Sequence, residues 1–204
     1  MKLNPVRLST FRNTWYQPGR SAFVRASWFL IGCPLVRSAL IPSSALRSAV
    51  LKLFGTRIGV GVVLKPGVQV KYPWRLSIGD DSWIGENCWI DNLADVSIGR
   101  NVCISQGAHL CTGNHDWSDP SFGLILRSIT LNDGSWVGAQ SFIGPGVELG
   151  QCAVATAGAV VTKSIPEYQI HSGNPAQFIR IRNIQDPANP NRSSPTPSPT
   201  LVQH

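Results

Sequence analysis

Aliphatic residues recur every six positions through most of this chain. Two of the steps are eight residues long, and the pattern stops after Leu110 and resumes at Leu131. A fixed short period is typical of stacked structural units, which bury their apolar faces only against neighbouring coils. The repeated positions are Ile58, Leu64, Val70, Ile78, Ile84, Ile90, Ile98, Ile104, Leu110, Leu131, Val137, Ile143, Leu149, Ala155 and Val161.

The six-residue period favours short β-strands over α-helices. An apolar stripe on a helix returns every three or four residues, whereas these units are rich in glycine and β-branched residues. In a unit such as residues 84–89, the aliphatic first residue and the small fifth residue can both face one interior. Pairs such as Gly79-Asp80 and Pro145-Gly146 suit the turns between strands. The pattern therefore predicts an all-β fold.

The interruption of the repeat is the candidate for chemistry. Residues 110–117 read LCTGNHDW and place His115 beside Asp116 where the pattern breaks. Residues 116–130 then depart from the repeat and are predicted to project as a loop. Long loops on a regular scaffold are more often functional than not. On these residues alone, His115 is either a catalytic group or an ordinary surface histidine.

Four motifs add a family resemblance to the repeat: Tyr72-Pro73-Trp74, Ser105-Gln106-Gly107, residues 111–116 and Gly173-Asn174-Pro175-Ala176. With them the chain resembles the hexapeptide acyltransferases, most of all the colanic-acid-type exopolysaccharide O-acetyltransferases. The resemblance covers residues 58–182. It implies a left-handed parallel β-helix with three units per coil, assembled as a homotrimer with active sites between subunits. It also implies acetyl-CoA-dependent acetylation of a sugar hydroxyl in exopolysaccharide biosynthesis.

The resemblance implies that His115 is the general base of this reaction. An attacking hydroxyl must lose its proton, and an imidazole titrates near neutral pH. Asp116 is expected to orient the imidazole or to contact the acceptor. Cys111 is a less favoured candidate nucleophile, because it fills a small-residue position of the repeat and the acceptor oxygen can attack the thioester itself.

The acceptor is expected near the coil before His115. Asn92 matches an acceptor-contacting position of the family, and Asp91 beside it could bind hydroxyls; a plain turn pair is an equally good interpretation. Trp117, together with Trp83 and Trp89, could stack on sugar rings or lie in a trimer contact.

The donor is expected along the later coils. In the family, the pantetheine arm lies between subunits against backbone groups, and a backbone amide near Ala139 is a candidate oxyanion donor. Thr162, Lys163 and Arg180 match positions near the nucleotide phosphates. Without the resemblance, ordinary solvated charge is the preferred explanation of the two cations. Gln177 stands where a basic residue is usual. The positions that match the pantetheine groove are Trp136, Gly138, Ala139, Ala157 and Gly158.

Residues 1–57 form an arm followed by short helical pieces in which apolar residues alternate with Arg25, Arg37, Arg47 and Lys52. Two interpretations remain open for them. They form a helical cap on the first coil, or a basic amphipathic surface that rests on the inner face of a membrane. The longest uncharged run is too short for a spanning helix, which needs about 20 apolar residues. No cleavage pattern indicates a signal peptide.

Length, composition and charge limit the domain organisation, the partners and the location of the protein. The length of 204 residues and the 43% hydrophobic content suit one globular domain, here residues 58–184, followed by a Pro-rich disordered tail at 185–204. The net charge of +7 suits an anionic lipid or a phosphorylated ligand, and the dispersed arginines disfavour nucleic acid. Five cysteines without a secretory signal suggest reduced thiols and a cytoplasmic location.

Two other functions are compatible with a β-helix. A non-catalytic β-helix scaffold would bind no CoA. A zinc-dependent hydrolyase on the same fold would need three converging imidazoles, for which His109, His115 and His171 are the candidates. His109 and His115 are expected to face different sides of a coil, so no metal is predicted.

Overall fold

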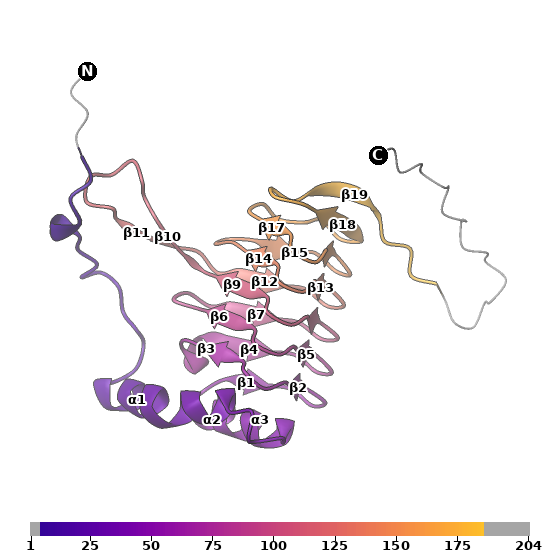
Figure 1. Ribbon diagram of the computed structural model, residues 1–204, viewed down its shortest axis with the longest axis horizontal. Helices are drawn as coiled ribbons and strands as arrows, with labels where there is room; N and C mark the ends of the chain where they lie inside the picture. Colours follow the sequence, from indigo (N-terminus) through magenta and orange to yellow (C-terminus); the bar gives the residue numbers. More distant parts are fainter. Residues whose placement is uncertain (1–4, 186–204) are drawn as a thin grey trace.

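The computed structural model describes residues 5–185, and its centre is a column of short stacked strands in three faces (Figure 1). Face A contains β1 (Arg57–Ile58), β4 (Leu76–Ile78), β7 (Val96–Ile98), β12 (Ile129–Leu131) and β15 (Glu148–Leu149). Face B contains β2 (Val63–Leu64), β5 (Trp83–Ile84), β8 (Cys103–Ile104), β13 (Trp136–Val137), β16 (Val154–Ala155), β18 (Gln169–Ser172) and β19 (Gln177–Ile181). Face C contains β3 (Gln69–Val70), β6 (Trp89–Asp91), β9 (His109–Cys111), β14 (Phe142–Ile143) and β17 (Val160–Val161).

The chain visits the faces in the order A, B, C in every coil, and neighbouring coils pair in parallel. The antiparallel pair β18–β19 at the end of face B is the exception among the three faces. This is the parallel β-helix that the six-residue period and the family resemblance predict, and it is consistent with the left-handed form. Its strands contain two to four residues except β19, because each hexapeptide supplies one short strand and one corner.

The register explains the period. Ile58 pairs with Ile78, Ile78 with Ile98, and Ile98 with Leu131, so equivalent aliphatic residues stack in a column. Every repeated aliphatic position except Ile58 is buried. Burial of a large aliphatic side chain contributes about 1.5–3 kcal/mol, so the interior column supplies most of the stability of the coils.

The corners between faces B and C need an unusual backbone. The same corner position has a positive φ in five successive coils, and its occupants are Gly67, Asn87, Gly107, Gln140 and Gly158. Glycine adopts this conformation without strain, and Asn tolerates it better than most residues. The amide of each later residue donates to a carbonyl of the coil before it, as Gly158 does to Ala139 at 2.8 Å.

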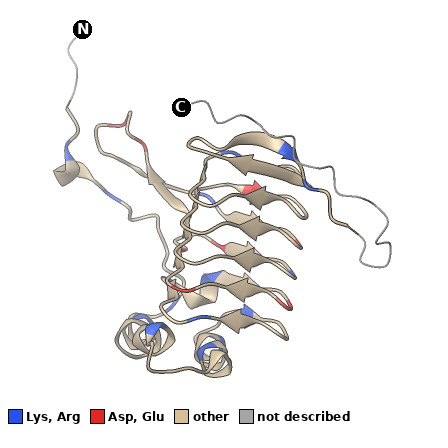
Figure 2. Ribbon diagram, turned by 45° about the vertical axis from the view of Figure 1, so that its right-hand side comes forward, with Lys and Arg blue, Asp and Glu red and all other residues tan. Residues whose placement is uncertain are grey.

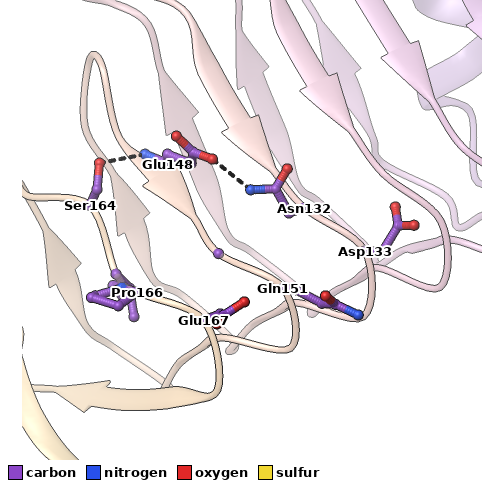
Figure 3. Close-up of a pocket in the computed structure, with 9 residues that line it drawn as sticks. Asn132, Asp133, Glu148, Gln151, Ser164, Pro166 and Glu167 are labelled. Carbon is purple, nitrogen blue, oxygen red and sulfur yellow. Dashed lines mark hydrogen bonds between the residues drawn. The ribbon is translucent and has the colours of Figure 1, made fainter.

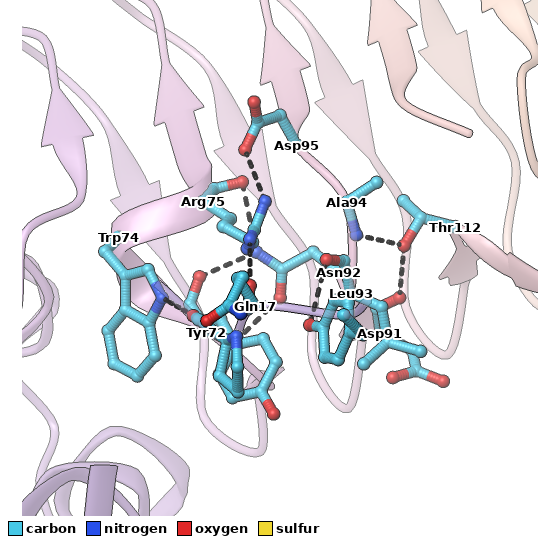
Figure 4. Close-up of polar contacts among 12 residues, drawn as sticks. Gln17, Tyr72, Trp74, Arg75, Asp91, Asn92, Leu93, Ala94, Asp95 and Thr112 are labelled. Carbon is cyan, nitrogen blue, oxygen red and sulfur yellow. Dashed lines mark hydrogen bonds and ion pairs between the residues drawn. The ribbon is translucent and has the colours of Figure 1, made fainter. Parts of the chain in front are cut away.

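Buried polar side chains hold the corners between faces C and A (Figure 4). The fully buried Asn92 accepts a hydrogen bond from the Tyr72 amide at 2.9 Å and donates to the carbonyls of Tyr72 and Arg75 at 2.8 and 3.1 Å. One coil later, the hydroxyl of buried Thr112 accepts from the amide of Ala94 at 3.0 Å. These side chains satisfy backbone groups that no strand partner reaches.

Helices close the open end of the first coil. They are α1 (Ala22–Ser27), the π-helix η2 (Trp28–Gly32), α2 (Cys33–Arg37) and α3 (Ser44–Leu53), and together we call them the cap. Trp28, Val36 and Leu51 of the cap are buried in the same core as the coils. The Trp28 indole donates to the Val70 carbonyl at 3.2 Å, and the Ser44 hydroxyl accepts from the Leu64 amide at 2.8 Å. The cap therefore satisfies strand groups that the first coil would otherwise expose.

Residues 5–20 run from the cap along the outside of the coils, with one 3-10 turn, η1 (Leu8–Thr10). Tyr16 donates through its hydroxyl to the Leu93 carbonyl at 3.0 Å, and the Arg7 amide donates to the Pro120 carbonyl at 2.8 Å. The segment, here called the arm, thus reaches the insertion that contains His115. Apart from residue 185, the predicted disordered tail lies outside the described residues, as do residues 1–4.

Among residues 5–185, none of the helices combines the length and the apolar character that crossing a bilayer requires.

Replacement of Asn92 by Ala should destabilise the protein. The change leaves three buried backbone groups without their partner, which we expect to cost about 3 kcal/mol and to lower Tm by about 6–12 °C. Thermal unfolding followed by circular dichroism measures the shift. Asn132→Ala is the matched control, because Asn132 is only half-buried and its amide bonds one side chain, Glu148. Equal shifts for both variants would contradict the structural role of Asn92.

Candidate active site

The interruption between the third and fourth coils is a β-hairpin. β10 (Gly113–His115) pairs antiparallel with β11 (Leu124–Leu126), and the hairpin projects from the corner where face C meets face A (Figure 1). The coil resumes at Ile129, which pairs with Val96. The sequence therefore placed a projecting segment correctly, but its strands begin before residue 116 and include His115.

His115 is held by the far strand of this hairpin. Its Nδ1 lies 2.8 Å from the carbonyl oxygen of Phe122, and its ring stacks on the Phe122 ring with centroids 4.4 Å apart. A carbonyl only accepts hydrogen bonds, so the neutral imidazole has its proton on Nδ1 and a free lone pair on Nε2. An imidazole in this tautomer can take a proton from a substrate at Nε2.

The arm also contacts His115. The Phe11 ring meets the imidazole edge-on, with centroids 5.7 Å apart and planes at 61°. The imidazole is therefore in contact with one ring of the hairpin and one of the arm. The sequence gives no sign of the contact between Phe11 and His115, because a segment without a repeat does not indicate what it packs against.

The two sides of the hairpin face different surroundings. Asn114 and its partner Ile125 line a groove of about 470 Å³, together with Trp117, Phe142 and Thr162. His115 and its partner Leu124 belong to the opposite side, because successive strand residues point in opposite directions. Trp117 and Thr162, two predicted site residues, therefore share a groove that His115 does not line.

Asp116 does not orient His115. Its carboxylate instead accepts hydrogen bonds from the amide of Ser118 at 2.9 Å and from the Ser118 hydroxyl. These bonds lower the pKa of Asp116 from its ordinary value. The predicted orienting role belongs to the Phe122 carbonyl, which sequence could not reveal because a backbone group leaves no residue signature.

The predicted acceptor residues are separated. Asn92 has no exposed surface and all its hydrogen-bonding groups are engaged with the corner backbone, so it is not available to a ligand. Asp91 is half-buried, and its carboxylate lies 2.9 Å from the ammonium of Lys71 (Figure 4 shows its place beside Asn92). Of this pair, only Asp91 keeps a side chain that a hydroxyl group could reach.

The three tryptophans considered for sugar stacking do not form one surface. Trp83 lies on face B, where it is 58% exposed and lines a second groove of about 380 Å³. Trp89 lies on face C and stacks on His109 with centroids 4.3 Å apart. Trp117 follows the hairpin strand β10. The six-residue period places residues 83 and 89 on neighbouring faces, which separates their indoles.

The residues that match the pantetheine groove gather at the corner between faces B and C. They are Trp136, Gly138, Ala139, Ala157 and Gly158. A Cβ on Gly138 would lie 2.4 Å from the Ala157 amide nitrogen, so only glycine fits between these coils. Gly158 has a φ of +70° and open space on its side-chain side. Within the described chain, the Ala139 carbonyl has a backbone partner whereas its N–H donates to no backbone acceptor.

The predicted phosphate-binding residues lie elsewhere. Thr162 and Lys163 follow β17 at the corner between faces C and A, and Arg180 lies on β19, opposite Ile170 of face B. All three side chains are exposed. On one chain, the pantetheine corner and the His115 hairpin therefore occupy opposite edges of face C. One chain by itself therefore keeps the pantetheine corner away from His115, although Thr162 lies in the groove beside the hairpin.

Neither Cys111 nor a metal site competes with this arrangement. The Cys111 thiol donates to the Gly113 carbonyl at 3.2 Å, and burial raises its pKa, which disfavours the nucleophilic thiolate. All five cysteines are free. His109 lies on face C and His171 on face B. The group of possible metal ligands among the described residues is Asp91, His109 and Cys111, which contains one imidazole rather than the three of the zinc alternative.

A larger hollow of about 650 Å³ lies at the edge of face A, on the last coils (Figure 3). Three carboxylates line it, those of Asp133, Glu148 and Glu167. Glu148 accepts a hydrogen bond from the Asn132 amide group at 2.7 Å. This hollow contains no imidazole and would repel a phosphorylated donor, so we place no part of the candidate site there.

Known proteins with the same repeat resemble this chain in sequence and in fold. A family model described as the hexapeptide repeat of succinyl-transferase matches residues 75–110 and 129–163, which leaves out the hairpin. The chain is 38% identical over 136 residues to WcaF of Escherichia coli, which carries the name of a colanic acid biosynthesis acetyltransferase. This alignment covers 67% of the chain and 75% of WcaF. The chain belongs to the hexapeptide-repeat acyltransferases.

Other members of the hexapeptide-repeat acyltransferases extend the comparison. The galactoside O-acetyltransferase of Escherichia coli is 30% identical over 143 residues, 69% of this chain and 70% of the relative. A solved galactoside acetyltransferase in complex with coenzyme A superposes with a TM-score of 0.69 at 27% identity, covering 79% of this chain and 82% of that one. A Vibrio cholerae acetyltransferase complexed with acetyl coenzyme A shares the fold, with a TM-score of 0.71 at 24% identity over 81% and 92%.

The tautomer of His115 can be tested directly. Because the Phe122 carbonyl accepts from Nδ1, we expect the neutral ring to carry its proton there, and ¹⁵N shifts of the labelled imidazole report which nitrogen is protonated. His115→Gln removes the signal and so assigns it. A neutral ring with its proton on Nε2 would contradict the proposed hydrogen bond.

Proposed function

We propose that this protein is an acetyl-CoA-dependent O-acetyltransferase that acts on a sugar hydroxyl in exopolysaccharide biosynthesis, with His115 as the general base. The observation that carries the proposal is the imidazole whose Nδ1 is engaged by the Phe122 carbonyl, which leaves Nε2 free to accept a proton. Membership of the hexapeptide-repeat acyltransferases and similarity to WcaF support the reaction class and the polysaccharide role.

The proposed reaction is a direct transfer in a ternary complex. The acceptor oxygen attacks the thioester carbonyl carbon while Nε2 of His115 takes the hydroxyl proton. The C–S bond of the resulting tetrahedral intermediate then breaks, the acetyl group stays on the sugar oxygen, and the proton passes from Nε2 to the sulfur of CoA. The free N–H of Ala139 is our candidate donor to the developing oxyanion, a role that can contribute several kcal/mol.

We further propose a homotrimer with sites between subunits. The pantetheine corner and the hairpin lie at opposite edges of face C, so a neighbouring chain that presents its corner to this hairpin would unite the two halves. In this arrangement Thr162, Lys163 and Arg180 would approach the phosphates of the donor. The exposed Trp136, whose indole donates to Ser105 at 2.9 Å, would line the groove between subunits.

For the acceptor, we propose a carbohydrate, free or lipid-linked. Asp91 and Trp117 are the candidate contacts that keep accessible side chains, and Trp83 offers an exposed indole on face B for stacking. The five free thiols and the need for acetyl-CoA favour a cytoplasmic location, with peripheral contact to the inner face of the membrane.

Replacement of His115 should abolish most turnover. His115→Ala removes the imidazole that we propose takes the hydroxyl proton, so kcat should fall by about 10²–10⁴-fold with the fold retained. Acetyl transfer to a panel of sugar acceptors measures it. Asp116→Asn is the matched control and should keep turnover close to wild type, since Asp116 bonds only its own turn. Full activity of His115→Ala would overturn the mechanism.

Donor binding can be measured without knowledge of the acceptor. Titration calorimetry with CoA and acetyl-CoA should show saturable binding, and Lys163→Ala or Arg180→Ala should each raise Kd about tenfold through the loss of a charged phosphate partner. Lys52→Ala on the cap is the control and should leave Kd unchanged. A folded protein that binds neither ligand would instead support the scaffold function.

A further inference from the structure

The outer side of the cap carries large apolar side chains that nothing in the described chain covers. Phe23, Leu30, Leu40 and Leu53 are 80%, 78%, 93% and 81% exposed. Trp28, Val36 and Leu51 on the inner side are fully buried against the coils. Packing on the coils explains the inner side only. A helical segment that is apolar on both sides is typical of one with a second apolar environment.

These four residues and the less exposed Phe29, Ile31, Leu35 and Leu46 form what we call the cap surface. The groups are contributed by α1, η2, α2, the following loop and α3, so they span the whole cap rather than one helix. Four of the six large apolar side chains in the described chain that are more than three-quarters exposed belong to it. The most exposed of the large apolar side chains are therefore concentrated on the cap.

The part of the chain that forms the cap and the first coil is also basic. Residues 21–79 contain eight Lys and Arg and no Asp or Glu, whereas residues 80–204 contain six Lys and Arg and all eleven acidic residues. Figure 2 shows basic residues on the helices of the cap. Among the described residues, no carboxylate lies within ion-pair distance of Arg25, Arg37 or Lys52. These cations stand beside the apolar side chains without a partner of opposite charge.

We propose that the cap surface docks on an anionic phospholipid bilayer. Phe23, Leu30 and Leu40 would enter the boundary between headgroups and acyl chains, and Arg37 and Lys52 would contact the anionic headgroups. A second copy of this chain is a poorer occupant, because it would bring two strongly positive ends together and pay for their repulsion. The combination of apolar side chains with unpaired cations is the complement of an anionic lipid surface.

Docking through the cap also fixes the orientation of the protein. The coils stack away from the cap at about 4.8 Å per coil, and the hairpin leaves the third coil. The hairpin that carries His115 extends toward the end of the column that lies away from the cap (Figure 1), so it would point away from the membrane. The docking surface and the site of the proposed reaction share no residue, so each can be wrong without the other.

Flotation of the full-length protein with lipid vesicles tests the proposal. We expect binding to vesicles that contain phosphatidylglycerol, little binding to phosphatidylcholine alone, and weaker binding at high salt. Leu40→Asp should reduce the partition coefficient at least about tenfold. Ile179→Asp, which changes an exposed apolar residue on β19 at the other end of the column, should leave it unchanged.

A second pair of variants tests the charge. Arg37→Gln should reduce the partition coefficient about fivefold. Arg100→Gln is the control and should have little effect, because Arg100 lies in the third coil and not on the cap. All four variants should keep the wild-type circular dichroism spectrum and CoA affinity, which separates loss of docking from loss of fold.

Three outcomes would overturn the proposal. Folded wild-type protein that does not float with phosphatidylglycerol vesicles would show that lipid is not the occupant. Equal flotation of Leu40→Asp and Ile179→Asp would show that the cap surface is not the contact. Self-association that light scattering detects in the wild type and not in Leu40→Asp, without vesicle binding, would identify a second copy as the occupant.

Discussion

The structure depends on one constraint, the stacking of equivalent residues from coil to coil. Parallel pairing places each aliphatic residue above the corresponding residue of the coil before it, as Ile78 lies between Ile58 and Ile98. The repeated aliphatic residues of the three faces form three such columns, which together fill one interior. An insertion is accommodated at a corner, where the chain passes from one face to the next. The hairpin that contains His115 emerges from such a corner without changing the register on either side, since Ile129 pairs with Val96 directly after it.

The hairpin fixes the tautomer of the neutral His115 ring through a backbone carbonyl rather than a carboxylate. A carboxylate partner would place a negative charge beside the imidazole. The Phe122 carbonyl orients the ring without adding a charge. Phe11 of the arm and Phe122 of the hairpin enclose the ring, so two segments distant in sequence define its position. These contacts hold the His115 ring in place although the residue lies on a projecting hairpin.

The two ends of the column have different characters. The C-terminal end closes with the antiparallel strands β18 and β19, and the N-terminal end closes with the helical cap, whose inner side joins the core. Both ends satisfy the exposed strand edges that a β-helix would otherwise present. Of the two described ends, the cap carries the more exposed large apolar side chains and belongs to the part of the chain without acidic residues. The sequence left open whether these helices cap the first coil or form a surface for a membrane. The inner side of the cap packs on the coils, and the outer side is exposed.

The sequence by itself determined the repeat, the buried positions, the interruption and the family, because each follows from a local period or motif that survives without tertiary contacts. Almost every predicted aliphatic position is buried, and His115 lies on the projecting segment. The tertiary structure decided what each polar residue bonds. It turned Asn92 into a buried support for the corner at Tyr72, placed Trp83 and Trp89 on different faces, and assigned the orientation of His115 to a carbonyl instead of Asp116. Backbone partners and the direction of a side chain at a corner depend on the coil above or below, about twenty residues away in sequence, and no local pattern specifies them.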